Sequence, residues 1–232
     1  MLAVNLAFEL AARGSKVCLV DLDELFPAIH DYFALPQRQA SVLAGIRLIA
    51  QDRLDEDKLA ELVSRLVCKG AALDYLSGFG LNENPIDYVH LERLISRLCE
   101  RYEFVVLDSS ANPTAEAAGL VNRLAHRRLL VIPADSVGLA RLAALSSQLE
   151  TESLGQLEVV LNRAYSGSSG RTSAQLQKSV RDITALPLAA IIPADQQLEE
   201  AGARGVPLRQ LGQKSKALSA IGDLAQRLMS TL

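Results

Sequence analysis

Side chains suited to ligand binding stand directly after five strongly apolar segments of this 232-residue sequence. They are Asp21 and Asp23 after the first segment, Asp108 after the second, Asp135 after the third, Asn162 after the fourth, and Pro193 with Asp195 after the fifth. In an open parallel sheet, ligands bind beyond the carboxyl ends of the strands, because loops and helix N-termini present free N–H groups to anions there. We therefore look for the chemistry of the chain at these positions.

A carboxylate that ends a buried apolar strand can hold Mg²⁺, directly or through water, beside the phosphates of a nucleotide. Asp108, at the end of FVVLD, has this Walker B placement. An aspartate there can instead cap the next helix or accept loop N–H bonds, so Asp108 alone leaves both interpretations open. Asp21 and Asp23 are close enough to repel each other unless cations, donors or water keep them ionised, and loop capping is the alternative for them too.

Asn162 offers an amide that both donates and accepts, as is needed to read the edge of a purine, although an asparagine can also simply form a turn.

Cys18, Cys68 and Cys99 lie in apolar contexts without a CxxC or Cys/His cluster. This usage predicts reduced core thiols in a cytoplasmic protein. The glycine-containing segments fit neither GxGxxG nor GxxxxGK[ST], and the three histidines lack metal-ligand spacing.

The spacing of apolar residues along the chain predicts the strands and helices that position these side chains. Apolar runs typical of strands buried on both faces cover 17–22, 104–108, 129–133, 159–162 and 188–193. Helical periodicity covers 2–13, 55–67, 88–101, 114–125, 138–154, 172–183, 196–204 and 215–230, and the excursion 24–87 adds a weak strand near 72–76. The alternation predicts one α/β domain over 1–232, a three-layer, doubly wound, mostly parallel sheet with helices on both faces.

Composition excludes several classes of protein. With 49% hydrophobic residues, 22% charged residues and a net charge of −3, the chain lacks the basic excess of a sequence-independent nucleic-acid binder. No apolar run approaches the length of about 18 residues that suggests a membrane span. Asn5 and Glu9 interrupt the apolar N-terminus at helical positions, which favours a helix over a signal peptide. The amphipathic segment 215–230 carries few positive charges, so we expect it to pack on the sheet, with at most peripheral membrane contact.

Taken in this order, the segments resemble the ParA/MinD superfamily of deviant-Walker ATPases, and within it the TadZ/CpaE branch of Tad (Flp) pilus assembly. The segment AVNLAFELAARGSKVCLVDLDELFPAIHDYFAL is similar to the helix after the phosphate loop and the strand and switch that follow it. YEFVVLDSSANPTAEAAGLVNRLAHRRLLVIPAD is similar to Walker B and the next strand. LEVVLNRAYSGSSG and LPLAAIIPADQQLEEAGARGVPL resemble the adenine-side segments, so the likeness spans nearly the whole chain.

The resemblance implies ATP and Mg²⁺ as ligands and a role for each candidate residue. Asp23 would orient the attacking water as the catalytic residue, Asp108 would bind Mg²⁺ directly or through water with Asp21 in support, and Asn162, Pro193 and Asp195 would contact or wall the adenine. The implied partners are a second copy of the chain and pilus or secretion machinery, with no sequence-specific nucleic acid. The implied location is cytoplasmic, at a cell pole or peripheral to the inner membrane.

The phosphate loop of the family, KGGxGKT, would lie immediately before Leu2, whereas the sequence begins at Met1. We therefore expect the preceding strand and the loop to be missing, and the neighbouring strands to expose apolar edges. Backbone N–H groups and lysines of such a loop supply most of the stabilisation of the β- and γ-phosphates. Two functions follow: an ATP-dependent dimeric switch that needs upstream residues, and a degenerate scaffold of the same fold that localises a partner without hydrolysis.

Overall fold

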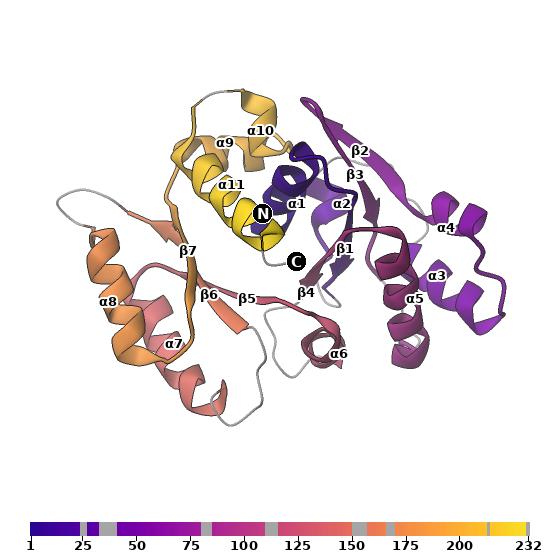
Figure 1. The fold of residues 1–232 in the computed structure, drawn as a ribbon, viewed down its shortest axis with the longest axis horizontal. Helices are drawn as coiled ribbons and strands as arrows, with labels where there is room; N and C mark the ends of the chain where they lie inside the picture. The colour runs from indigo at the N-terminus through magenta and orange to yellow at the C-terminus, as the bar shows by residue number, and fades with distance from the viewer. Residues whose placement is uncertain are drawn as a thin grey trace. The chain divides into compact units, whose positions relative to one another are not determined.

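The computed structural model describes residues 1–23, 27–32, 41–79, 85–109, 116–149, 157–165, 170–212 and 214–230. The chain forms two compact units, shown as ribbons in Figure 1. The first unit contains residues 1–124 and 201–212, and the second contains residues 125–200 and 213–232. Each unit therefore combines segments that are distant in the sequence.

The first unit is built on a four-stranded sheet with the order β2-β3-β1-β4. Its strands are β1 (Val17–Leu22), β2 (Ser64–Cys68), β3 (Ala71–Leu76) and β4 (Phe104–Ser109). β1 runs parallel to both of its neighbours, and β2 pairs antiparallel with β3. Every residue of β1 is buried, which explains why VCLVDL is almost continuously apolar: helices cover both faces of the sheet.

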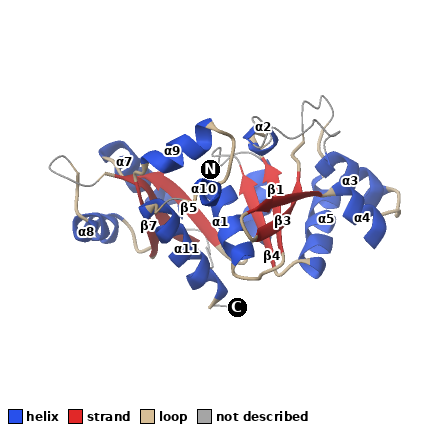
Figure 2. Ribbon diagram, turned by 90° about the horizontal axis from the view of Figure 1, so that it is seen from above, coloured by secondary structure: helices blue, strands red, loops and turns tan. Residues whose placement is uncertain are grey.

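Helices flank this sheet on two sides, with α1 packed on β1, β3 and β4, and α5 packed on β4 from the other side (Figures 1 and 2). α5 begins where the side chain of Asp87 accepts a hydrogen bond from the backbone N–H of His90. The helices of this unit are α1 (Leu2–Ala12), α2 (Ile29–Tyr32), α3 (Ser41–Ala50), α4 (Glu56–Leu62), α5 (Tyr88–Arg101), α6 (Glu116–Leu124) and α10 (Leu208–Leu211). A further helix, α9 (Gln196–Ala203), runs from the second unit into the first.

The second unit is built on three parallel strands with the order β5-β6-β7. These are β5 (Arg128–Pro133), β6 (Leu157–Ala164) and β7 (Leu188–Pro193). Helices α7 (Ser136–Leu149) and α8 (Ser173–Ile183) cover one face, where Leu142, Val159, Leu161 and Val180 form part of the core. α11 (Lys216–Met229) packs against β7 on the other side (Figure 1). Val159 and Leu161 of β6 therefore face α7 and α8, whereas Glu158, at an alternate position, faces α11.

The predicted fold class is confirmed, because parallel strands alternate with helices on both sides of each sheet. The predicted strands 17–22 and 188–193 have the observed bounds, and the weak strand near 72–76 is β3. C-terminal helix 215–230 also packs on the sheet as expected, with Ile221 and Leu224 buried. The extent of a single domain over 1–232 stays a prediction.

Two expectations were wrong. The helix predicted over 55–67 ends at Leu62, and residues 64–68 form β2 instead, because Leu66 and Cys68 point inward while Arg65 and Val67 are exposed. This alternation has the period of a strand that is half buried. Among the three thiols expected in the core, Cys99 is exposed, on the outer side of α5.

β4 and β5 each have one free edge, since β4 pairs with β1 and β5 with β6 in the part of the chain that the structure describes. All six residues of β4 are half-buried, and Val131 of β5 is 43% exposed. Among the described helices, none is long and apolar enough to cross a membrane.

Candidate functional site

The carboxyl ends of β1 and β4 place two of the predicted aspartates side by side. Asp21 and Asp108 are partners in the parallel register of these strands, and residues paired in this way project to the same face about 5 Å apart. Asp21 is 1% exposed, whereas Asp108 is half-buried. The predicted metal ligand and its supporting carboxylate therefore share one edge of the sheet.

Asp21 organises the segment that follows β1. Its Oδ1 accepts a hydrogen bond of 3.2 Å from the backbone N–H of Asp23, and its Oδ2 accepts one of 3.1 Å from that of Ile29. Burial, with smaller contributions from the nearby charges of Asp108 and Asp23, raises the pKa of Asp21 to about 6 despite the lowering effect of the two N–H groups. Because its carboxyl group is costly to ionise, Asp21 fits a site where a cation approaches.

Asp108 lies close to Asp23 and to the start of the chain. Burial raises the pKa of Asp108, the N-terminal ammonium of Met1 lowers it, and the charge of Asp23 raises it again. The N-terminus of α1 is therefore close to this carboxylate. Met1 occupies the N-cap position without a side-chain hydrogen bond to the helix, and the first N–H groups of a helix are the donors that bind anions at helix N-termini.

The three aspartates could supply some of the ligands of a metal ion, with water and phosphate oxygens supplying the others. Among the described residues, no group of three or more His, Cys, Asp or Glu side chains could hold a metal ion by itself. Mg²⁺ is ordinarily held by one or two carboxylates together with waters and phosphate oxygens, rather than by a cage made of protein alone. Asp21, Asp23 and Asp108 beside the N-terminus of α1 match this requirement.

The carboxyl ends of β6 and β7, in the second unit, carry the predicted adenine-side residues. Asn162 is opposite Pro133 in the register of β5 and β6, and its side-chain Oδ1 accepts a 3.0 Å hydrogen bond from the backbone N–H of Arg163. Arg163 has a φ of 58°, and the pairing of β6 with β7 shifts register between Leu161 and Ala164. This bulge is a local rearrangement of the kind that re-aims a side chain at a strand end.

Asp195 acts as a cap for two helices. Its Oδ1 accepts from the backbone N–H of Gln197 at 2.9 Å, and its Oδ2 accepts from the Ser215 hydroxyl at 2.7 Å and from the Ala217 N–H at 3.2 Å. Burial alone would raise the pKa of Asp195, but the hydrogen bonds from Ser215, Ala217 and Gln197 hold it below its usual value. Both of its oxygens are thus used within the protein, and its contact with adenine stays a prediction.

A family assignment follows from comparison with known sequences. The profile of the CobQ/CobB/MinD/ParA nucleotide binding domain matches residues 1–208. The chain belongs to this family.

Individual relatives agree with this ParA/MinD assignment. The septum site-determining protein MinD of Synechocystis is 24% identical over 230 residues, which cover 97% of this chain and 82% of that protein. The crystal structure of a ParA family ATPase from Chlorobium tepidum superposes with a TM-score of 0.80 at 22% identity, covering 98% of this chain and 91% of the other. MinD from Pyrococcus horikoshii, solved in complex with Mg-ADP, gives a TM-score of 0.72 at 20% identity, with 98% and 88% covered. The chain therefore has the ATPase-like fold of ParA and MinD proteins.

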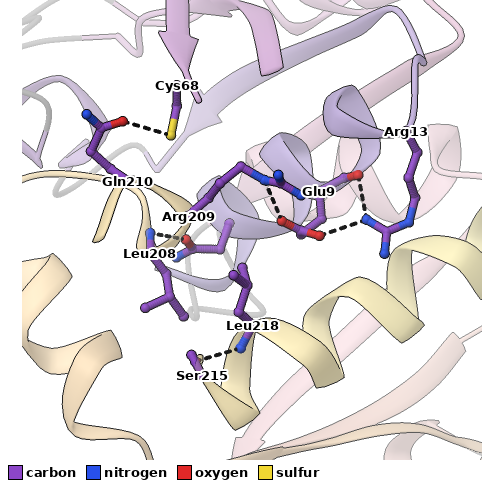
Figure 3. A network of polar contacts seen from close by, with 9 residues as sticks. Glu9, Arg13, Cys68, Leu208, Arg209, Gln210, Ser215 and Leu218 are labelled. Atoms are coloured by element: carbon purple, nitrogen blue, oxygen red, sulfur yellow. Dashed lines mark hydrogen bonds and ion pairs between the residues drawn. The ribbon is translucent and has the colours of Figure 1, made fainter. Parts of the chain in front are cut away.

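Two buried polar residues of α1 in this ParA/MinD fold were not recognised as binding groups from the sequence (Figure 3). Asn5 accepts a 2.8 Å hydrogen bond from the backbone N–H of Leu208, and Glu9 pairs with Arg13 at 2.7 Å and with Arg209 at 2.9 Å. Both residues are at most 3% exposed. They fasten the segment around α10 to α1. Their only sequence signal was their position on the apolar face of a helix.

Gly78 is a second feature that sequence reasoning missed, since its segment was compared only with the glycine motifs of phosphate-binding loops. A Cβ atom at this position would lie 2.8 Å from the Cβ of Pro27 and 3.1 Å from the carbonyl oxygen of Asp21. No side chain fits between them without displacement. The end of β3 can therefore approach the segment that follows Asp21 only because residue 78 is glycine.

Proposed function

We propose that this ParA/MinD-type chain is a nucleotide-dependent dimeric switch that positions a macromolecular assembly. The observation that carries the proposal is the meeting of Asp21, Asp23 and Asp108 beside the N-terminus of α1. The assembly is inferred to be the Tad (Flp) pilus machinery at a cell pole, because the segment LPLAAIIPADQQLEEAGARGVPL resembles the TadZ/CpaE branch. The relative named as septum site-determining protein supports a positioning role in general.

The site supports a division of labour among its residues. The phosphates of ATP would accept hydrogen bonds from the first N–H groups of α1, as anions do at helix N-termini. Asp108 would hold Mg²⁺ directly or through water, and Asp23 would accept a hydrogen bond from the attacking water and orient it. Asp21 keeps the segment between them in place through its bonds to Asp23 and Ile29. When bound, Mg²⁺ supplies charge neutralisation of the phosphates.

The residues predicted to contact adenine are Asn162, Pro193 and Asp195, which all belong to the second unit. Asn162 would contact the base through its amide, with its Oδ1 already steadied by the Arg163 N–H. Pro193 would provide an apolar wall for the ring at the end of β7. Asp195 would act there indirectly, by holding the N-termini of α9 and α11 next to this wall. The complex of the Pyrococcus MinD with Mg-ADP supports a magnesium nucleotide as the ligand.

The experiment is a measurement of molar mass with and without Mg-ATP, on the chain 1–232 and on the same chain with any residues that its gene encodes upstream. We expect ATP to shift the mass toward a dimer in wild type and not in Asp108→Asn. Asp182→Asn, an exposed aspartate of α8, is the matched control and should behave as wild type. If neither chain dimerises or binds ATP, the switch is wrong.

A non-hydrolysing scaffold of the same fold is the second candidate, and one observation favours it. The oxygens of Asp21 and Asp195 are all engaged by hydrogen bonds from within the chain, so these carboxylates have structural roles that need no nucleotide. In this case the fold would localise a partner through protein contacts alone. Steady-state release of phosphate from Mg-ATP that Asp23→Ala abolishes would exclude the scaffold.

A further inference from the structure

A surface pocket of about 470 Å³ lies between α3 and α5 in the first unit. These two helices are side by side in both views of the fold (Figures 1 and 2). The pocket shares no residue with either group of predicted nucleotide-binding residues. It is lined by Ile49, Asp52, Leu54, Arg93, Ser96 and Arg97.

The positive charge of this pocket comes from two arginines one turn apart on α5. Arg97 pairs with Glu100 at 2.7 Å, whereas Arg93 has no hydrogen bond or ion pair to any residue that the structure describes. A carboxylate placed beside Arg93 would supply the kind of partner that Arg97 has in Glu100, and it matches the planar donors of a guanidinium group.

The lining on the α3 side of the pocket is apolar except for Asp52. Ile49 ends the exposed side of α3, and Leu54 follows after a reversal of the chain, with both side chains half-buried. The reversal needs Asp52, which has a φ of 52°, and it is held by a 2.8 Å hydrogen bond from the Arg53 N–H to the Leu48 carbonyl. The side chains of Ile49 and Leu54 therefore give the pocket an apolar part in addition to its two arginines.

We propose that this pocket binds an acidic, amphipathic segment of a partner protein. A glutamate or aspartate of the segment pairs with Arg93, and an apolar side chain one helical turn away packs on Ile49 and Leu54. The volume lies within the range of about 300–1,000 Å³ that is usual for ligand pockets. The proposal goes beyond the nucleotide switch, because none of its residues belongs to that site and no step of it needs ATP.

Charge complementarity favours a protein segment over a nucleic acid. The carboxylate of Asp52 lines the same pocket as the arginines, and Glu100 is paired to Arg97 beside it. Both acidic groups would repel a run of phosphates but would tolerate a single carboxylate. An apolar wall also has no function in binding a phosphate backbone, where extended basic surface is the usual requirement.

The test uses nuclear magnetic resonance of the whole chain and a synthetic helical peptide that carries glutamate and leucine on one face. We expect the peptide to shift the methyl signals of Ile49 and Leu54 and the side-chain signal of Arg93. Arg93→Glu should weaken binding about tenfold or more, whereas Arg181→Glu, an exposed arginine of α8, should leave it unchanged.

Three further probes keep the result decisive. Leu54→Asn should weaken the peptide but not inorganic phosphate, since only the peptide uses the apolar wall. Equal binding of phosphate and peptide, or tighter binding of a single-stranded DNA oligonucleotide through the same residues, would overturn the proposal. So would the absence of shifts at Ile49 and Leu54 at millimolar peptide. Each of these results leaves the ATP-dependent dimer unaffected, so the two proposals fail separately.

Discussion

The carboxyl group of Asp21 is almost completely buried, so its ionisation costs free energy. Its two backbone donors stabilise the charged form, but burial outweighs them and the carboxylate of Asp108 adds repulsion. A group whose pKa is raised on folding binds its proton more tightly in the folded state than in the unfolded chain. Asp21 therefore stabilises the fold most at low pH.

This argument predicts a pH dependence for Asp21→Asn. The stabilising contribution of Asp21 should be complete below its unfolded pKa near 3.8 and lost as pH rises through about 6. The difference in free energy of unfolding between wild type and Asp21→Asn should thus fall by about 1–3 kcal/mol from pH 4 to pH 7. Urea denaturation without Mg²⁺ measures it. A difference that stays flat with pH, as we expect for Asp182→Asn, would contradict the buried carboxyl group.

Gly138, near the start of α7, has no room for a side chain. A Cβ atom there would lie 2.0 Å from the carbonyl oxygen of Pro133, whereas one at Gly119 would meet only the end of the Arg123 side chain at 3.8 Å. Gly138→Ala should therefore lower the free energy of unfolding by about 2–4 kcal/mol through overpacking. Gly119→Ala, also within a helix, should raise it by about 0.5–1 kcal/mol. Thermal unfolding of both variants checks the pair, and equal effects would refute the close approach.

At the scale of elements, α11 is attached near both of its ends. Its N-terminus is capped by Ser215, whose hydroxyl also donates to Asp195. Near its C-terminus, Arg227 pairs with the buried Glu158 of β6, which also pairs with Arg127. Arg227 further donates to the backbone carbonyl of Ala189 at 3.1 Å. The helix is thus fixed to both ends of the strands that it covers.

Arg227→Met should loosen this attachment. The variant leaves the buried carboxylate of Glu158 with Arg127 as its remaining partner and removes the bonds to the β7 backbone, at a cost of about 1–3 kcal/mol. Arg181→Met is the matched control and should change stability by less than about 0.5 kcal/mol. Chemical denaturation measures both. The double variant with Glu158→Leu should recover part of the loss, and full additivity would show that the two residues are uncoupled.

The capping box of α8 gives a smaller and cleaner test. The hydroxyl of Thr172 accepts from the Gln175 N–H at 3.2 Å, and the Gln175 side chain accepts from the Thr172 N–H at 2.8 Å. Thr172→Ala should cost about 1 kcal/mol. Ser173→Ala, at the next position of the helix, should be nearly neutral. Urea titrations of the two variants compare them, and an equal loss in both would mean that the box does not stabilise the helix.

Sequence reasoning succeeded where the determining pattern is local. The bounds of β1 and β7 followed from continuous apolar runs, and α5 from its spacing of leucines. Local patterns also located Asp21 and Asp108, but only the parallel register put them opposite each other. β2 was missed because five residues with two outward positions resemble the end of the preceding helix. Asn5 and Glu9 could not be interpreted, since their partners lie 203 and 200 residues further along the chain.

At the scale of the whole molecule, the C-terminal helix is the element on which membrane contact depends. Ile221, Leu224 and Ala225 of α11 are each at most 2% exposed. Insertion of this face into lipid would require it to leave β7. We expect vesicles containing phosphatidylglycerol to sediment no more of wild type than of Leu228→Gln, a half-buried position at the edge of the face. Strong sedimentation of wild type alone would show that α11 is released in the presence of lipid.

The bonds from α1 to the segment around α10 also bear on how the protein is made. The first unit includes residues 201–212, so its N-terminal part leaves the ribosome long before Leu208 and Arg209 exist to satisfy Asn5 and Glu9. Synthesis at about 5–20 residues per second delays the bonds of these buried groups to Leu208 and Arg209 by about 10–40 s. Such distant closures are slow steps in folding. A nascent chain stalled before residue 200 should therefore be cut by protease within α1, and one released at 232 should resist.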